Sequence, residues 1–399
     1  GKLDETFMTI LKANSRVPIE VEGDTYALMT CVECGSRRTS ECLADIGITD
    51  LVQISDYIID TSRERTRDLI NKLPRGTYHY EMRVDGYDEP LDLVAAMTIS
   101  DGEVIVDFAG SSGRSAKGIN CPLNYASAYA CFALKCALAP DIPNNEGALA
   151  PLVIKAPENS ITNAQYPAPV AMRHVVGQLL PDVVFGCLHQ AVPGLVPAEG
   201  TCCLWDLPMR GGYSVNTDAS KTKFATELVH NGGTGGRPSK DGLSATAFPS
   251  GVMGSLVEIT ESVSPLIIWQ REYRQDSAGA GEFRGGLGQV LEISSSEDAP
   301  ISLFAALDRI NHAPRGREGG KNGELGSLTL SNGTKLRPKG EQIIPAGQRL
   351  TVLTPGGAGY GDPKDRTPER IAQDIDFGLI SADAAASDYG HRPGEEEQK

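Results

Sequence analysis

The stretch TPGGAGYGDP, residues 354–363, holds four glycines and follows a run, Arg349–Thr354, that is typical of a β-strand. A phosphate-binding loop needs its glycines to lead into a helix and a Lys to meet the phosphate charge. Here the glycines run into Asp362-Pro363, and Lys364 comes late. The pattern therefore favours a structural turn over a phosphate site.

Outward from this stretch, the C-terminal half is predicted to be β-rich. Residues 256–360 contain strand candidates at 263–273 and 288–293 and a hairpin signal around Asn332-Gly333. Two short helices are expected at the end of the chain, one capped by Thr367 and one capped by Ser381.

A second hairpin is predicted at residues 97–108. Asp101-Gly102 supplies the positive φ angles that a tight turn demands, and a half-buried strand is expected at 78–84. A loop rich in Gly and Ser follows Phe108, and a helix is expected from Tyr125 onward. This loop is either an anion-binding loop or a structured turn.

The remaining segments complete the expected organisation. Residues 1–75 are predicted to be helical, with N-cap candidates at 60–62, and residues 140–170 to form an extended connector. Pro181 should kink the apolar run 171–192 or start a second helix. The long stretch 230–251 is typical of a functional or a disordered loop, and its apolar residues argue against disorder.

The predicted fold class is therefore α+β, with mixed helices and antiparallel sheets and a β-rich C-terminal part that ends in short helices. Three regions are expected: a helical segment at 1–75, a hairpin-plus-helix region at 76–200, and a glycine-rich, β-rich region at 201–399.

The composition of the chain argues against two classes of protein, those that bind nucleic acids and those that span membranes. A formal net charge of -15 over 399 residues argues against nucleic-acid binding, and the sequence has no stretch of 18 apolar residues that would cross a membrane. The nine cysteines suit reduced thiols in a cytoplasmic protein. Cys31-x-x-Cys34 is either half of a zinc site or a pair of buried small side chains. The chain starts at Gly1 with no signal peptide and is expected to be a fragment or a processed piece.

Motifs for well-known chemistry are missing from the sequence. It has no Gly-x-Ser-x-Gly elbow, no GxxxxGK[ST] loop and no His-Glu-x-x-His, and its six histidines are scattered. We therefore expect no metal site made by this chain alone. His174 is a candidate site residue at a helix start, with a structural role as the alternative.

Six blocks in order carry a resemblance that spans the chain from about residue 4 to Gly390. They are VIVDFAGSSGRSAKGINCPLN (104–124), MRHVV (172–176), GGRPSKDGLSATAFPSG (235–251), DSAGAGEFRGGLGQ (276–289), PRGREGGKNG (314–323) and TPGGAGYGDPKDRTPERIAQDIDFGLIS (354–381). Together they resemble the hydantoinase B/oxoprolinase family, and most closely its members labelled N-methylhydantoinase B.

The resemblance implies the B component of an ATP-dependent hydrolase that acts on cyclic amides such as 5-oxoproline or hydantoins. A hydantoinase A-type subunit or domain would bind ATP with Mg2+ and phosphorylate the amide oxygen, so a hetero-oligomer is expected. Related members instead carboxylate acetone or acetophenone, and a scaffold without chemistry of its own is the third alternative.

The chain departs from the family in one respect. The family's N-terminal metal-ligand segment has no match here, so a divalent metal is expected from that missing portion, and this piece is not expected to be active alone. The matched positions supply substrate-binding candidates, each with a turn-forming role as the alternative, and no catalytic residue is assigned. They are Asp107, Ser111, Ser112, Asn120, Arg173, His174, Arg237, Asp241, Asp276, Ser277 and Arg284.

Overall fold

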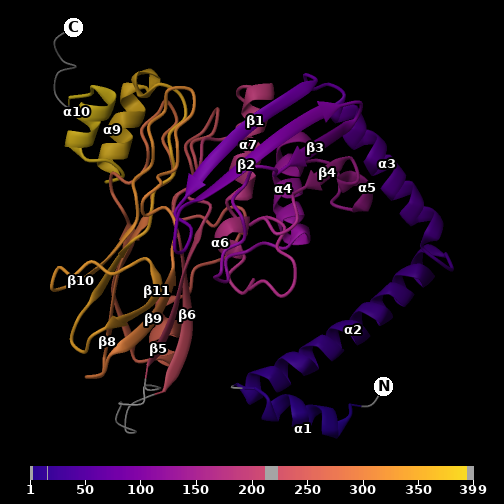
Figure 1. The fold of residues 1–399 in the computed structure, drawn as a ribbon, viewed down its shortest axis with the longest axis horizontal. Helices are drawn as coiled ribbons and strands as arrows, with labels where there is room; N and C mark the ends of the chain where they lie inside the picture. Colours follow the sequence, from indigo (N-terminus) through magenta and orange to yellow (C-terminus); the bar gives the residue numbers. More distant parts are fainter. Residues whose placement is uncertain (1–2, 16, 212–222, 393–399) are drawn as a thin grey trace. The chain divides into compact units, whose positions relative to one another are not determined.

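The structure is a computed structural model that describes residues 3–15, 17–211 and 223–392. Backbone contacts divide the chain into two compact units, Gly1–Ser62 and Arg63–Lys399. No helix in the described residues is both long and apolar enough to cross a membrane. The predicted α+β class is confirmed, with mixed helices and sheets and short helices at the C-terminal end (Figure 1).

The first unit consists of helices. It contains α1 (Glu5–Ala13), α2 (Pro18–Ile46) and the first part of α3 (Val52–Ile70), and α2 buries none of its side chains. The N-cap predicted at 60–62 is wrong, because these residues lie inside α3. The Ser62 hydroxyl donates to the Ile58 carbonyl 2.6 Å away, so it serves the helix interior and not a helix start.

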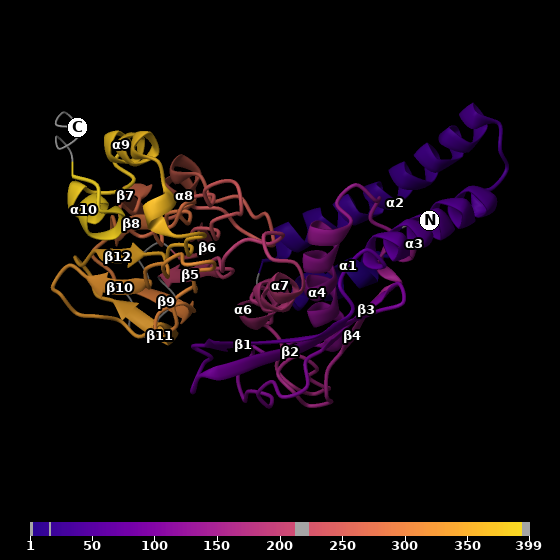
Figure 2. The same ribbon diagram turned by 90° about the horizontal axis from the view of Figure 1, so that it is seen from above.

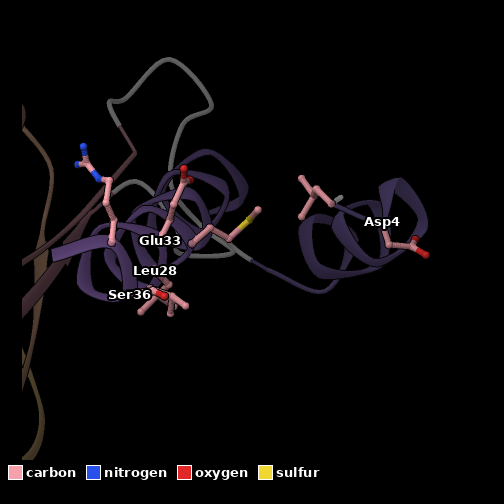
Figure 3. Close-up of a pocket in the computed structure, with 8 residues that line it drawn as sticks. Asp4, Leu28, Glu33 and Ser36 are labelled. Atoms are coloured by element: carbon pink, nitrogen blue, oxygen red, sulfur yellow. The ribbon is translucent and has the colours of Figure 1, made fainter. Parts of the chain in front are cut away.

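A wide hollow of about 980 Å³ lies between α1 and α2 (Figure 3). Its lining residues are Leu3, Asp4, Leu28, Met29, Val32, Glu33, Ser36 and Arg37. Cys31, Cys34 and Cys42 of α2 are exposed free thiols, so the interpretation of the Cys31-x-x-Cys34 pair as buried small side chains is wrong. The hollow is open and brings together no buried polar groups, so it is a poor candidate for chemistry.

In the second unit, the last part of α3 is followed by a four-stranded sheet in the order β1-β2-β3-β4. The strands are β1 (Gly76–Val84), β2 (Leu91–Ser100), β3 (Glu103–Asp107) and β4 (Leu152–Lys155). The predicted hairpin is confirmed: Ser100 pairs with Glu103, and Gly102 has φ +73°. The connector expected at 140–170 is wrong in part, because β4 lies inside it and pairs parallel to β3.

Helices cover one face of this sheet. They are α4 (Leu123–Leu138), α5 (Glu146–Leu149), α6 (His174–Gly177) and α7 (Leu180–Ala191), and both views place α4 and α7 on the same side of β1 and β2 (Figure 2). Pro181 lies in the first turn of α7, so it starts a second helix as one of the two predictions had it. Alternate residues of β2 and the apolar side of α7 form the first core.

Two further four-stranded sheets, β11-β9-β5-β6 and β10-β12-β8-β7, form a sandwich around the second core. The first contains β5 (Leu204–Gly211), β6 (Phe224–Asn231), β9 (Ile301–Ala306) and β11 (Lys339–Ile344). The second contains β7 (Leu266–Tyr273), β8 (Gln289–Ser295), β10 (Ser327–Leu330) and β12 (Leu350–Leu353). Helix α8 (Val257–Val263) packs beside β7. Inward-facing residues of both sheets, such as Trp205 and Leu291, are fully buried.

The predicted C-terminal helices are confirmed. A short 3-10 helix, η1 (Pro363–Asp365), precedes α9 (Pro368–Asp376) and α10 (Ala382–Tyr389). Thr367 and Ser381 accept hydrogen bonds from backbone N–H groups of α9 and α10, as N-cap residues do.

The opening stretch lies in a layer of extended glycine-rich segments without regular strand pairing, which we call the glycine layer: residues 198–201, 232–245, 276–288, 314–324 and 354–361 (Figure 1). Within 356–361, backbone N–H groups donate to residues of three other segments, for example Ala358 to Glu199, Gly357 to Gly286 and Gly359 to Lys321. A β-strand pairs with at most two neighbours, whereas this segment has more.

Only glycine permits so close an approach of several backbones. A Cβ atom added to Gly357 would lie 2.0 Å from the Thr234 oxygen, and one added to Gly285 would lie 1.9 Å from the Gly357 oxygen. The expectation of a turn at 354–363 is therefore wrong for its first half, which is a buried extended segment. The same packing orders the stretch 230–251. From the sequence this stretch is either a functional or a disordered loop, and its apolar residues argue against disorder.

Candidate functional site

The predicted residues of the loop after β3 serve the local backbone. Ser111 Oγ accepts from the Val94 N–H (2.9 Å), and Ser112 Oγ accepts from the Asp92 N–H (2.9 Å). Asp107 accepts from its own loop, from the N–H of Ala109. Buried Asn120 accepts from the Ser115 N–H and donates to three carbonyl groups: Ser115, Lys117 and Pro169. These contacts shape the loop.

Arg173 and His174 lie elsewhere, at the start of α6. The Arg173 guanidinium stacks over the Tyr125 ring at 5.2 Å, and burial lowers the pKa of His174. His174 is therefore held neutral at pH 7, when it offers one donor and one acceptor.

Three predicted residues meet in a charged cluster with the C-terminal helices. Asp241 pairs with Arg366 (2.8 Å), and Arg284 pairs with Asp374 (3.1 Å). Although burial opposes ionisation, the hydrogen bond from Arg366 lowers the pKa of Asp241. Arg237 donates to the backbone oxygen of Asp241. Arg366 thus occupies the Asp241 carboxylate and Asp374 of α9 occupies the Arg284 guanidinium, so the cluster holds α9 on the glycine layer.

The last predicted pair, Asp276 and Ser277, borders the glycine layer. Asp276 accepts from the Ser381 N–H (2.7 Å), and buried Ser277 accepts from the Gly288 N–H (3.0 Å). The structure thus places the predicted residues in several separate groups and does not gather them into one site.

A different cluster, which we call the Asp85 site, lies where β1 ends. The Asp85 carboxylate, 2% exposed, lies 2.6 Å from His312 Nδ1 and accepts from the backbone N–H groups of Ile310 and Asn311. A carboxylate only accepts, so it favours the tautomer of His312 with the proton on Nδ1. Nε2 then carries the lone pair on a ring that is 25% exposed. A base fixed by a third group in this way is suited to proton transfer.

Asp308 and Lys339 adjoin this pair. Asp308 accepts from the Asp85 N–H (3.1 Å) and pairs with Lys339 (3.3 Å). Burial raises the pKa of Asp308, whereas Lys339 opposes this shift. The side chain of Lys339 is 11% exposed and supplies a positive charge beside the acids.

Two cavities lie against the segment 87–90, and Asp85 lines one of them. One, of about 410 Å³, is lined by Asp85, Tyr87, Asp88, Glu89, Pro90, Asn311, Arg337, Pro338 and Lys339. The other, of about 400 Å³, shares the wall 87–90 and is lined beyond it by Leu91, Ser112, Gly113, Arg114, Ser115 and Ala116. The loop predicted from the sequence therefore lines the second cavity through Ser112, beyond the shared wall 87–90.

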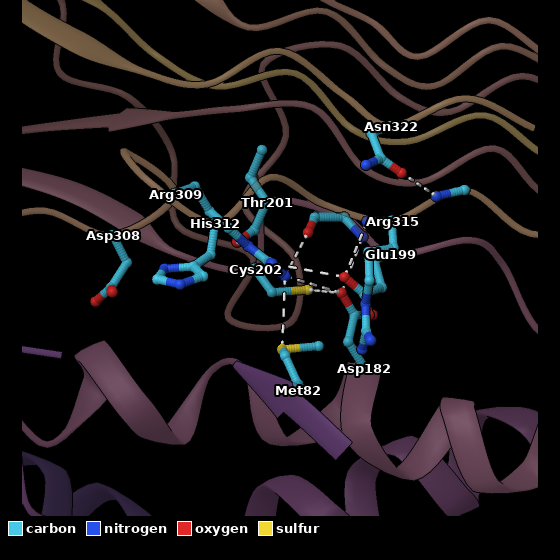
Figure 4. A network of polar contacts seen from close by, with 12 residues as sticks. Met82, Asp182, Glu199, Thr201, Cys202, Asp308, Arg309, His312, Arg315 and Asn322 are labelled. Atoms are coloured by element: carbon cyan, nitrogen blue, oxygen red, sulfur yellow. Dashed lines mark hydrogen bonds and ion pairs between the residues drawn. The ribbon is translucent and has the colours of Figure 1, made fainter. Parts of the chain in front are cut away.

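A buried ionic network lies close by (Figure 4). Arg309, 1% exposed, lies 3.5 Å from Glu199 and 3.8 Å from Asp182, and Arg315 pairs with Glu199 at 2.7 Å. Burial opposes ionisation of Glu199, but Arg309 and Arg315 lower its pKa. Asp182 accepts from the Cys202 thiol (3.1 Å), and burial followed by the Glu199 charge raises its pKa to about 6.

Sequence reasoning missed the Asp85 site. In the sequence, Asp85-Gly86 carries only the Asp-Gly pattern of a turn, and the left-handed φ of +65° at Gly86 agrees with that pattern. His312 was one of six scattered histidines. The two residues are 227 positions apart, and no local pattern connects them. Within the described residues, no group of three or more His, Cys, Asp or Glu could hold a metal ion, so they do not fit the metal that the resemblance implies.

Comparison with known proteins finds relatives that match almost the whole length of this chain. The B component of the putative D-/L-hydantoinase of Pseudomonas sp. (strain NS671) is 29% identical over 96% of this chain and 66% of its own length. The beta subunit of the caprolactamase of Pseudomonas jessenii is 27% identical over 98% of this chain and 69% of its own length. The chain thus spans about two thirds of the length of these relatives.

Two solved structures share the fold. The ATP-dependent caprolactamase from Pseudomonas jessenii aligns with a TM-score of 0.88, over 100% of this chain and 71% of that chain, at 24% identity. The nucleotide-free acetone carboxylase aligns with a TM-score of 0.70, over 82% of this chain and 51% of that chain, at 20% identity. The model of the family described as hydantoinase B/oxoprolinase matches residues 1–363, and this chain therefore belongs to the hydantoinase B/oxoprolinase family.

Proposed function

We propose that this chain is the B component of an ATP-dependent cyclic amidohydrolase. It would open a lactam or hydantoin ring after a hydantoinase A-type component has phosphorylated the amide oxygen. The observation that carries the proposal is the family match over residues 1–363. The names of two relatives, the B component of a hydantoinase and the beta subunit of a caprolactamase, support both the ring-opening reaction and a partner chain.

The chemistry explains why ATP is needed. An amide carbon is a poor electrophile, and transfer of the γ-phosphoryl group to the amide oxygen activates it and releases ADP. Addition of water and cleavage of the ring C–N bond give an acyl phosphate, and a second water releases phosphate. One ATP and two waters thus yield ADP, phosphate and the ring-opened amino acid. ATP and Mg2+ are assigned to the A component.

Within this scheme we assign proton transfer to the Asp85 site. His312, held at Nδ1 by Asp85, would take a proton from the attacking water through Nε2, and Lys339 would favour the anionic intermediate beside it. General-base groups of this kind contribute about 10²–10⁴-fold to a rate. No step is derived through a metal, because the described residues offer no site for one.

Reconstitution tests the reaction class. The chain is combined with its A component and ATP and supplied in turn with caprolactam, 5-oxoproline, hydantoin and acetophenone. The proposal predicts ADP and a ring-opened amino acid in equal amounts, without bicarbonate. A product that forms only with bicarbonate would instead identify a carboxylase, the alternative that the acetone carboxylase fold keeps open.

The proposed compartment is the cytoplasm. The nine cysteines are all free, and such thiols persist in a reducing environment. Mass spectrometry of the protein alkylated in cell lysate tests this, since a cytoplasmic protein would carry the alkyl group on exposed Cys31, Cys34 and Cys42.

A further inference from the structure

A second polar cavity lies where β6 enters the glycine layer, beside β7, and is separate from the Asp85 site. It measures about 470 Å³ and is lined by Asn231, Ala245, Gly254, Arg271, Glu272, Tyr273 and Gln289. The predicted site residues are not among them. We call it the Arg271 cavity.

One residue of its wall has a buried polar atom without a partner. Six buried side-chain atoms in the described part of the chain lack a hydrogen bond, and one of them, Oδ1 of Asn231, belongs to a residue that lines the cavity. Both ring nitrogens of His230, which precedes Asn231 on β6 and does not line the cavity, are also among the six. The two residues are 1% and 4% exposed. A buried polar group without a partner costs about 1–3 kcal/mol, so such a group in a native protein calls for a ligand or ordered water.

Charge gives the cavity two poles. The Arg271 guanidinium donates to the Ser255 carbonyl through Nη1, which leaves its other N–H groups for a ligand. Glu272 also lines the wall; its exposed carboxylate accepts a hydrogen bond from Gln270 Nε2 (3.1 Å) and supplies a negative charge. Burial, followed by the Arg271 charge, lowers the pKa of His230 to about 4, so its imidazole is neutral at pH 7 and does not compete with Arg271 for an anion.

The backbone at the cavity is strained. Ala245 adopts φ +47°, a left-handed conformation that is uncommon for a residue with a Cβ atom. Its N–H donates to the Leu287 carbonyl (2.9 Å), so the glycine layer holds it in place. Strained residues of this kind cluster at ligand sites.

We propose that the Arg271 cavity binds a small zwitterionic amino acid. The carboxylate would pair with Arg271, the ammonium with Glu272, and Asn231 Oδ1 would accept a further N–H group. This complementarity needs one cation, one anion and one free acceptor, and the cavity supplies all three. The inference goes beyond the proposed function, because it concerns a second site and requires neither ATP nor a partner.

Calorimetry on the full chain alone, without an A component, tests this inference. The probes are 6-aminohexanoate and hexanoate, which differ in the ammonium group. We expect 6-aminohexanoate to bind at millimolar concentrations about tenfold more tightly than hexanoate, which corresponds to one charged hydrogen bond. The E272Q variant should remove that difference, whereas R271Q should weaken both probes. E258Q, which changes an exposed acid of α8 outside the cavity, should leave binding unchanged.

Three outcomes would overturn the inference. The first is that neither probe binds the wild-type protein, which would leave ordered water as the partner of Asn231. The second is that the difference in affinity between the two probes is the same for wild type and E272Q, and the third is that R271Q binds the probes as tightly as wild type. Circular dichroism of R271Q checks that the variant folds. If R271Q does not fold, E272Q still tests the inference, because Glu272 is exposed.

Discussion

One guanidinium between two carboxylates decides which acid in the buried network stays ionised. Arg309 lies closer to Glu199 than to Asp182, and Arg315 adds a second cation only to Glu199. Glu199 therefore keeps its charge, and Asp182 is pushed toward the protonated form. A buried ion pair of this kind is costly to break, because removal of one partner leaves an uncompensated charge.

The raised pKa of Asp182 predicts a pH dependence of stability. Between about pH 4 and the folded pKa of about 6, folded Asp182 keeps a proton that the unfolded chain has released. Unfolding then releases a proton, so the free energy of unfolding falls as the pH rises through this window, by about 3 kcal/mol. D182N keeps an acceptor for the Gly200 N–H and should lose this slope. Urea unfolding of both proteins across the window measures it, and equal slopes would refute the assignment.

His312 carries a prediction on activity. H312Q should lower kcat of the reconstituted enzyme about 10²–10⁴-fold, because the proton acceptor is lost. H79Q, at an exposed histidine on β1, is the matched control and should be silent. D85N should also lower kcat, because the carboxylate that orients the ring is lost. If H312Q lowers only thermal stability and leaves kcat intact, then the pair is a structural link between β1 and the 308–312 loop.

At the scale of elements, the glycine layer distinguishes this fold from an ordinary sandwich. Its extended segments pack backbone on backbone, and the side chains that would separate them are absent. A Cβ atom at Gly357 would lie 2.0 Å from the Thr234 oxygen, inside any allowed contact. The layer therefore tolerates no larger residue at such positions without displacement of a neighbouring chain segment.

The G357A variant tests this packing. We expect it to lower the free energy of unfolding by more than about 3 kcal/mol, since the clash involves backbone that cannot rotate away. G113A is the control: Gly113 has open space around it and no positive φ, so the change should be nearly neutral. Urea unfolding monitored by fluorescence compares the two, and equal midpoints would contradict the close packing.

Local signals predicted the elements and missed their assembly. The 97–108 hairpin, α4 and the caps of α9 and α10 depend on residues within a few positions of one another. The neighbours of 356–361 come from four distant stretches, so the sequence showed glycines but not why they are needed. Likewise, Ser112 belongs to a loop that local sequence signals identify, and it lines a cavity. His312 contacts Asp85 only because the folded sandwich brings the two residues together, which no local pattern predicts.

At the scale of the molecule, the Asp85 site and the buried network both join β1 and its neighbours to loops of the sandwich. Asp85 follows β1 and meets the 308–312 loop, and the Tyr80 hydroxyl of β1 donates to Glu199 (2.8 Å). Burial, reinforced by Glu199, raises the pKa of Tyr80, so this donor stays protonated at physiological pH. The polar groups of the candidate site thus lie at the boundary between the two hydrophobic cores. Packing on both sides holds such residues in place, as a functional site requires.

The most direct test of the central claim is a comparison of ring opening by the A component with and without this chain. Both reactions contain ATP, Mg2+ and a lactam that the reconstituted enzyme uses, and the ring-opened amino acid is measured by chromatography. We predict product only when both chains are present, in a one-to-one ratio with ADP. Equal product from the A component alone would contradict the account and leave this chain a scaffold.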